Sequence, residues 1–366
     1  MRANLMSSQT EINLDSGLLE QIPGLPEPGK KPLFNAENLT ITNDGRLFVT
    51  GSLAVYEIVR DGDKRYRQQE IPIIAPDVPR NCFMNGITAQ GGSLYLACSH
   101  IHKGEDSLFP SLFGDVRQIE QNWLGFLLLI FAQSIYKVDS YILRASLENQ
   151  NPQFTDGIKL PGKCFANGLD GDGKGNLYVA NSLASFIKNP SFFKASLSSS
   201  GEIAQIEPLA FSSPNQDTPN GLKVRGEYVY YTCLHWLPVM TASLKRVKID
   251  GKDGGAGKAE VVYQSLFSIF DDFDITDNGF VIANIMNIPD RGAGSLQFVT
   301  NEGNLKGIFR NKGLNSPSSV KVVKKNSPYP DFLKGGDLVI TEKGRHCASR
   351  FRPNEEWRRW LVESPT

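Results

Sequence analysis

The sequence predicts an all-β fold, a six-bladed propeller formed by a single domain over residues 1–366. Three observations support this prediction. A short motif recurs along the chain, its copies lie about 50 residues apart, and no segment keeps the 3.6-residue hydrophobic period of a helix that connects parallel strands. A spacing near 50 residues holds about four short strands with their turns, which is the size of one propeller blade.

Each copy of the motif opens with a polar residue, which we call its pivot, usually followed by Gly and an aliphatic residue. A strand, a turn rich in Gly, Asn or Asp, and a second alternating strand follow, which is typical of a hairpin. The copies are ENLTITNDGRLFVTG from Glu37, NGITAQGGSLYLACS from Asn85, NGLDGDGKGNLYVANS from Asn167, NGLKVRGEYVYYTCL from Asn220, DDFDITDNGFVIANI from Asp271 and a weaker SSVKVV from Ser318. Successive pivots are 48, 82, 53, 51 and 47 residues apart, so only the second step is long. A β-sandwich is the alternative, but it does not require a polar residue at the start of each repeat.

The charge balance and the apolar segments exclude two classes of partner. The chain has 39 Lys plus Arg and 39 Asp plus Glu, so it offers no basic stripe for phosphates, and we expect no nucleic-acid partner. Its longest strongly apolar stretch, 123–132, is well short of the ~20 residues of a transmembrane helix. No secretory signal is evident at the N-terminus, so a cytoplasmic location is expected. The five Cys lack metal-binding spacing and are interpreted as buried free thiols.

The repeat phase predicts a metal site, because the first strand of each propeller blade lies beside the central channel. The pivots that meet around this axis are Glu37, Asn85, Asn167, Asn220, Asp271 and Ser318. Carboxylates and inward-turned amide carbonyls are the oxygen ligands that hard cations prefer. We therefore expect Ca²⁺, neutralised by Glu37, Asp271 and Asp272, with further oxygens from Asn167 and Asn220.

Two other interpretations of the pivots are weaker. Zinc is disfavoured because no His or Cys occupies a pivot. A single Asn-Gly pair would more often be a turn. Three Asn-Gly pivots in the same phase, at Asn85, Asn167 and Asn220, favour the metal.

The ordered set Glu, Asn, Asn, Asp, carried by ENLT, FANGLD, TPNGLK and DDFD, resembles that of the calcium-dependent six-bladed propeller hydrolases. These include regucalcin and gluconolactonase, diisopropylfluorophosphatase, and the paraoxonases and related lactonases. The resemblance spans roughly Glu37 to Gly344. It implies that Glu37, Asn167, Asn220 and Asp271 bind a calcium ion at the channel floor.

The resemblance also implies roles for neighbouring residues. Asp272 matches a position at which paraoxonases carry an additional ligand, and Asn85 matches a substrate-contacting Asn of the gluconolactonase branch. His100 resembles the second His of the paraoxonase pair, but the first is absent because Asn85 stands at that pivot. Strictosidine synthases share the fold but lack the metal set, so they fit less well.

Hydrolysis needs a base or nucleophile beside the ion, and Asp271 is the first candidate because its free carboxylate oxygen could activate water or attack directly. Glu37 is the second candidate and His100 an alternative base. Second strands return to the site face, so their ends border the pocket; residues there are His100, Asn181, Ser182, His235 and Asn284. Of these, we expect His235 and Asn284, together with Asn85, to contact the substrate.

The long second step predicts an insertion after the second strand of blade two, over the site face. Residues 101–137 are densely apolar toward their end and are expected to form a helix or helical pair. Three uses remain open: a lid or wall of the pocket, a peripheral membrane or partner contact through 108–136, or a helix packed on the propeller.

The sequence therefore favours a calcium-dependent hydrolase of a lactone or related ester, similar to lactonases and arylesterases. The alternative is a non-catalytic propeller that binds a protein or lipid partner through the same face.

Overall fold

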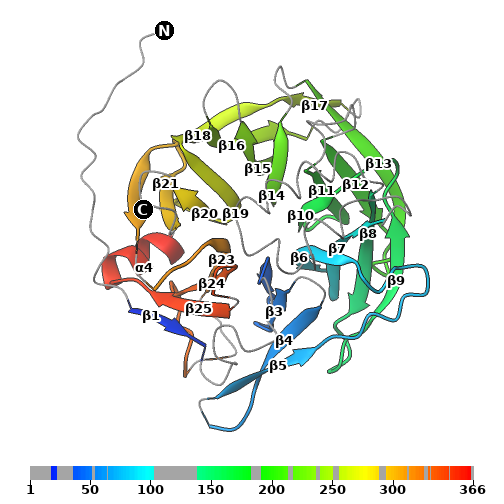
Figure 1. Ribbon diagram of the computed structural model, residues 1–366, viewed down its shortest axis with the longest axis horizontal. Helices are drawn as coiled ribbons and strands as arrows, with labels where there is room; N and C mark the ends of the chain where they lie inside the picture. Colours follow the sequence, from blue (N-terminus) through cyan, green and yellow to red (C-terminus); the bar gives the residue numbers. More distant parts are fainter. Residues whose placement is uncertain are drawn as a thin grey trace, which may run out of the picture.

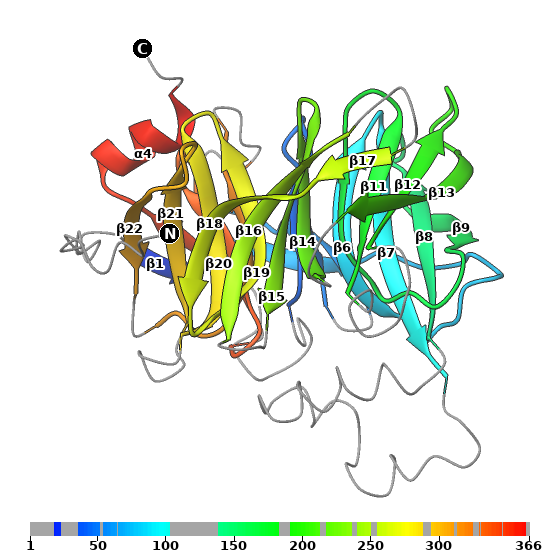
Figure 2. The ribbon, with the colours of Figure 1, turned by 90° about the horizontal axis from the view of Figure 1, so that it is seen from above.

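The computed structural model describes residues 18–22, 36–51, 54–63, 65–102, 138–182, 191–212, 217–235, 240–249, 255–287, 294–310, 313–324, 329, 331–345 and 347–363. Six sheets stand around one axis in chain order (Figure 1), and Figure 2 shows them from the side. The predicted all-β six-bladed propeller is confirmed. Within these ranges, no helix has the length and apolar character needed to cross a membrane.

The first three sheets each begin with the strand nearest the axis. Their strands are β2 (Leu39–Ile41), β3 (Leu47–Thr50), β4 (Val55–Arg60) and β5 (Tyr66–Glu70); β6 (Phe83–Gln90), β7 (Ser93–Ile101), β8 (Val138–Ser146) and β9 (Phe154–Lys159); and β10 (Ala166–Gly171), β11 (Asn176–Asn181), β12 (Phe192–Leu197) and β13 (Ile203–Ser212). A fifth strand, β17 (Gly255–Lys258), pairs in parallel with β13 at the outer edge of the third sheet.

The other three sheets follow the same plan. Their strands are β14 (Thr218–Arg225), β15 (Tyr228–His235), β16 (Thr241–Lys248) and β18 (Glu260–Leu266); β19 (Ser268–Thr276), β20 (Gly279–Asn287), β21 (Ser295–Thr300) and β22 (Leu305–Phe309); and β23 (Pro317–Val322), β24 (Leu338–Glu342), β25 (Cys347–Arg352) and β1 (Leu18–Gln21). The one helix of the described ranges, α4 (Glu355–Val362), packs Trp357 against Phe298 beside the fifth sheet.

The sixth sheet joins the two ends of the chain. β1 pairs antiparallel with β25 and supplies the outermost strand (Figure 1), and Glu20 forms an ion pair with Arg350. This pairing closes the ring, because the last blade borrows its fourth strand from the N-terminal segment. The sequence motif does not indicate this strand.

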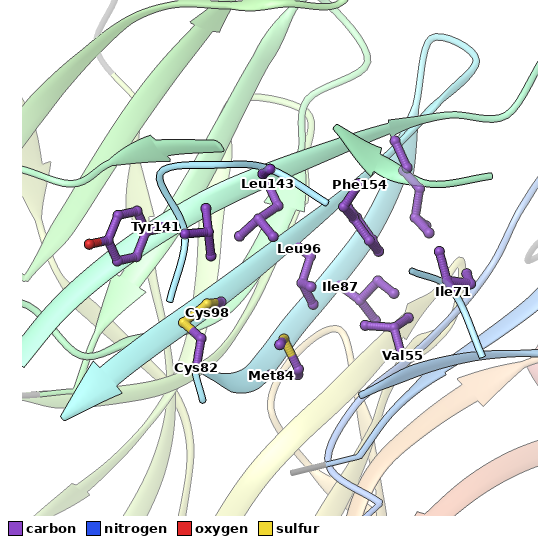
Figure 3. Packing of buried hydrophobic residues seen from close by; sticks show 14 of the residues in the cluster. Val55, Ile71, Cys82, Met84, Ile87, Leu96, Cys98, Tyr141, Leu143 and Phe154 are labelled. Carbon is purple, nitrogen blue, oxygen red and sulfur yellow. A yellow bond between two sulfur atoms is a disulfide. The ribbon is translucent and has the colours of Figure 1, made fainter. Parts of the chain in front are cut away.

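Hydrophobic residues fill the space between neighbouring blades. Figure 3 shows one such cluster, in which Val55 and Ile71 of the first blade pack against Met84, Ile87 and other residues of the second. Both faces of a blade are covered in this way, which explains why a second strand such as β3 is buried along its whole length rather than at alternate residues. The blades are thereby fixed relative to one another, and so are the residues they carry to the axis.

The structure corrects the expectation that all cysteines are free thiols. Cys82 and Cys98 form a disulfide, with their Cα atoms 5.7 Å apart, while the other cysteines are buried and free. Sequence spacing misses the pair because hairpin register, not sequence distance, brings Cys98 of β7 beside the start of β6. Disulfides are typical of oxidising compartments, so the pair counts against the expected cytoplasmic location, which stays a prediction.

The insertion falls where the sequence places it, because β7 and β8 are neighbours in the second sheet and the chain between them is long. β7 continues to Ile101, so the start of the range 101–137 is a strand end rather than a helix. Residues 103–137 lie outside the described residues. The predicted helical insertion is therefore not confirmed, and its uses stay open.

Candidate functional site

The innermost strands deliver the pivots to the axis through a repeated irregularity. In five of the six sheets the register between the first two strands shifts at the pivot. The shifts lie between Met84 and Ile87, Ala166 and Leu169, Pro219 and Leu222, Phe270 and Phe273, and Pro317 and Ser319. A bulge of this kind breaks the strict alternation of a strand and re-aims the side chain it carries.

The glycine after each Asn pivot allows neighbouring blades to approach closely at the axis. A Cβ on Gly86 would lie 2.2 Å from the carbonyl oxygen of Asn167, and one on Gly168 would lie 2.4 Å from that of Asn220. The same holds for Gly221, whose Cβ would lie 2.6 Å from the Asp271 carbonyl oxygen. At these three pivots Asn-Gly is therefore a packing requirement between blades, not a turn.

Hydroxyl groups on or directly after the second strands bind five of the six pivot segments to the preceding blade. Thr50 donates to the Asn85 carbonyl at 3.0 Å, Ser99 to the Ala166 carbonyl at 3.2 Å, and Ser182 to the Pro219 carbonyl at 2.7 Å. Thr232 donates in the same way to Asp271, and Thr341 donates to the Glu37 carbonyl at 3.2 Å. Five blade junctions thus carry a hydroxyl contact that positions the next pivot.

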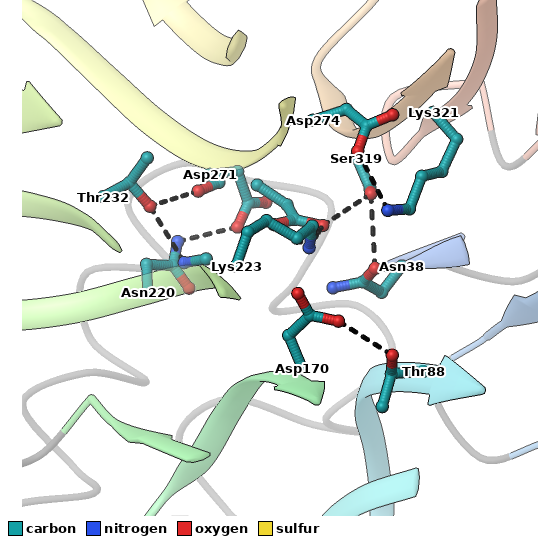
Figure 4. A network of polar contacts seen from close by, with 12 residues as sticks. Asn38, Thr88, Asp170, Asn220, Lys223, Thr232, Asp271, Asp274, Ser319 and Lys321 are labelled. Atoms are coloured by element: carbon teal, nitrogen blue, oxygen red, sulfur yellow. Dashed lines mark hydrogen bonds and ion pairs between the residues drawn. The ribbon is translucent and has the colours of Figure 1, made fainter. Parts of the chain in front are cut away.

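The structure brings together four of the predicted ligands at the axis. The Asn167 amide donates to the Asn220 side-chain carbonyl. In the next contact, which Figure 4 shows, Asn220 Nδ2 donates to Asp271 Oδ1 at 2.7 Å. Lys343 Nζ lies 3.1 Å from Asp271 Oδ2 and 2.7 Å from Glu37 Oε2. We call these five residues the axial ring. Side chains from blades one, three, four, five and six therefore form one chain of polar contacts.

Electrostatics at the axial ring favour a cation. Burial raises the pKa of Asp271 to about 7; the Lys343 ammonium opposes this shift, and the negative charge of Glu37 adds to it. Burial alone would lower the pKa of Lys343, but the negative charges of Asp271 and Glu37 outweigh this effect, and the pKa of Lys343 is raised. The ammonium therefore stays charged between two carboxylates that would otherwise repel each other.

Asp272 has partners of its own and does not join the axial ring. Its two oxygens accept from Lys223 Nζ at 2.7 and 2.8 Å, and Ser319 Oγ donates to it at 2.8 Å. Only 2% of the Asp272 side chain is exposed. The predicted additional ligand is thus held in a buried ion pair outside the axial ring.

A second polar layer crosses the axis three residues further along the inner strands (Figure 4). Lys321 Nζ lies 2.9 Å from Asp274 Oδ1, and Asp170 accepts from Thr88 Oγ1 at 2.9 Å and from the Val224 amide at 2.8 Å. This layer was not predicted. A signal for it is present in the sequence, because the fourth residue of every motif copy is polar.

Three other predicted residues are held by structural contacts. Asn85 Nδ2 donates to the Ala166 carbonyl at 2.6 Å, and Ser318 Oγ donates to the Ala36 carbonyl at 2.6 Å. Asn284 is fully buried; its Oδ1 accepts from the Ile269 amide at 3.1 Å and its Nδ2 lies 3.2 Å from Ser295 Oγ. Asn284 thus anchors the start of β19, which makes it a poor candidate for substrate contact.

The end of β7 carries a pair of histidines. The ring centroids of His100 and His102 are 4.6 Å apart, and His102 Nε2 lies 2.8 Å from Asp139 Oδ2, which Lys159 also contacts at 2.8 Å. Burial, with the neighbouring His102, lowers the pKa of His100. Within the described ranges His100 has no hydrogen bond to the axial ring. His102 and Asp139 were not predicted.

His235 belongs to a buried cluster at the end of β15. Its Nε2 lies 3.4 Å from Cys233 Sγ and 3.5 Å from Asp217 Oδ1. Asp217 is already paired with Lys245 at 2.7 Å and accepts from the Tyr231 hydroxyl at 2.7 Å. The predicted substrate contact through His235 stays untested, while its present partners are those of a structural polar cluster.

No family model matches the chain, and no curated protein matches it. Among solved structures, the soluble aldose sugar dehydrogenase of Escherichia coli in its apo form is similar with a TM-score of 0.56 and 12% identity, over 92% of this chain and 100% of that one. A Thermus thermophilus putative oxidoreductase (glucose dehydrogenase) gives 0.52 and 12%, over 92% and 99%. The Neurospora crassa Pan2 WD40 domain gives 0.50 and 8%, over 92% and 96%. At these identities the likeness shows the propeller fold alone; the first two of these proteins are described as enzymes.

Proposed function

We propose that the chain is a calcium-dependent hydrolase that cleaves a lactone or related ester bond at the propeller axis. The observation that supports it is the axial ring, in which Glu37, Asn167, Asn220 and Asp271 of four blades are linked by polar contacts, with Lys343 between Glu37 and Asp271. The proposal assigns the chain to the regucalcin, diisopropylfluorophosphatase and paraoxonase group that its motifs resemble.

The residues of the axial ring fit a calcium ion by their chemistry. Two carboxylates and two amides supply oxygen ligands, and an amide group presents its oxygen instead of its nitrogen by turning over. The ring contains no His or Cys, which zinc would favour. Buried carboxylates in contact with a single ammonium leave an excess of negative charge, which a divalent cation would offset.

In this proposal Glu37, Asn167, Asn220 and Asp271 hold the ion. When bound, calcium supplies a Lewis acid that polarises the carbonyl oxygen of the substrate and stabilises the oxyanion. Asp271 acts as general base: the carboxylate oxygen that the ion leaves free takes a proton from the attacking water. Glu37 is the second candidate for the proton acceptor.

His100 serves as the alternative base in this proposal. A depressed pKa keeps its imidazole neutral near pH 7, so that it is able to accept a proton. It lies in β7, the strand next to the one that carries the second pivot, Asn85.

The proposal predicts calcium-dependent turnover of a panel of lactones, arylesters and phosphotriesters. Purified protein should hydrolyse at least one class, lose the activity on chelation and regain it with calcium but not with magnesium, because magnesium demands tighter octahedral geometry. Turnover that survives complete chelation would contradict the proposal. Calcium binding without turnover of any substrate would favour the alternative, a propeller that binds a protein or lipid partner.

A further inference from the structure

Lys343 is the residue of the axial ring that neither the motif copies nor the proposed ligand set explains. It follows directly after β24, and its backbone amide donates to the Ser316 carbonyl at 3.0 Å, which anchors its main chain at the edge of the sixth blade. From there its side chain reaches the axis and contacts both carboxylates of the ring, at 2.7 Å for Glu37 and 3.1 Å for Asp271. Its ammonium group therefore takes the place of a cation between two blades.

We propose that Lys343 is a tethered counter-ion of the axial carboxylates, and that a calcium ion binds the axial ring by displacing its ammonium group. This inference rests on the calcium ligand set of the proposed function and adds a residue that sets calcium affinity.

The two cations compete because they use the same oxygen atoms. Calcium coordinates carboxylate oxygens at about 2.3–2.6 Å, and the ammonium already contacts Glu37 Oε2 and Asp271 Oδ2 at hydrogen-bond distance. An ion held by both carboxylates would lie within a few ångströms of the ammonium, where repulsion between a double and a single positive charge is strong. The ammonium must therefore leave before or as the ion enters.

The side chain of Lys343 has room to move away from the axis. The Lys343 side chain is 22% exposed, and a lysine stem has four rotatable methylene bonds. Lys223, which pairs with Asp272, is only 5% exposed; Lys321 is 21% exposed but pairs with Asp274. Competition at the axial ring is assigned to Lys343 because its ammonium contacts the two axial carboxylates, Glu37 and Asp271.

Calcium titration by calorimetry at about pH 8, where carboxylates are ionised, tests the proposal. Lys343→Met and Lys343→Gln should bind calcium about tenfold or more tightly than the wild type, because the competing charge is gone. Lys343→Arg keeps the charge and should stay within about threefold of the wild type. Lys159→Met is the matched control: it removes another lysine paired with a carboxylate, Asp139, and should leave calcium affinity unchanged.

Thermal unfolding provides a readout that is independent of activity. In chelator, the two neutral variants should melt at a lower temperature than the wild type, because the carboxylates lose their partner, and calcium should raise their melting temperature by more. Equal or weaker calcium binding by both neutral variants would overturn the role of Lys343 while leaving the proposed function intact. Absence of binding in wild type and variants alike would overturn both. Binding only in the neutral variants would support the competition.

Discussion

Asp271→Asn should lower calcium affinity by about 100-fold or more and turnover by at least a similar factor. The substitution removes one of two carboxylate charges from a buried ligand set, where charge is screened little. It also removes the proposed proton acceptor, so activity should remain low even at saturating calcium. Calorimetric titration with calcium and initial rates on the best substrate of the panel measure the two effects separately.

The neighbouring carboxylate provides a sharp comparison for this variant. Asp272→Asn alters a residue that pairs with Lys223 outside the axial ring, so it should reduce the free energy of unfolding while calcium affinity changes little. A loss of calcium affinity in Asp272→Asn that equals the loss in Asp271→Asn would show that the ligand set is assigned to the wrong carboxylate.

Gly168→Ala should lower the free energy of unfolding by about 3 kcal/mol or more, because the added methyl meets backbone rather than a flexible side chain. Its Cβ would lie 2.4 Å from the Asn220 carbonyl oxygen and 2.4 Å from the Leu222 amide nitrogen. Relief requires the third and fourth blades to separate at the axis, which would also pull Asn167 away from Asn220. Denaturant unfolding followed by fluorescence measures the change.

Gly257→Ala is the matched control for this substitution. Gly257 also lies in a strand, but a Cβ there would find its nearest neighbour, in Lys248, at 3.8 Å, which is ordinary contact. We expect a change within about 0.5 kcal/mol. If Gly168→Ala proved as mild as this control, the blades would not be in the close contact described at the axis.

The repeated blades were predictable because each blade places the same residue types in the same environment. The pivots Glu37, Asn167, Asn220 and Asp271 could be found from their phase alone, and the structure brings them together. The closing strand β1 could not be found, because four residues that pair with the far end of the chain leave no periodic signal.

Details inside the site depend on geometry that a repeat does not encode. Asp271 and Asp272 are adjacent in sequence, yet a register shift at this point gives them different partners. Lys343 directly follows β24, the second strand of the sixth blade. Residues at the ends of second strands were expected to border the site, but the sixth motif copy is too weak to show from sequence where its second strand ends. Asn284 was predicted to contact the substrate because it lies near the end of a second strand. In the structure its side chain accepts a hydrogen bond from the Ile269 amide and so fixes the start of β19.

A crystal structure determined with calcium in the crystallisation solution would test the proposed metal site most directly. The account predicts one ion on the axis, with oxygens of Glu37, Asn167, Asn220 and Asp271 at about 2.3–2.6 Å and the Lys343 ammonium moved away from both carboxylates. An axis without an ion at saturating calcium, with Lys343 still between Glu37 and Asp271, would contradict it.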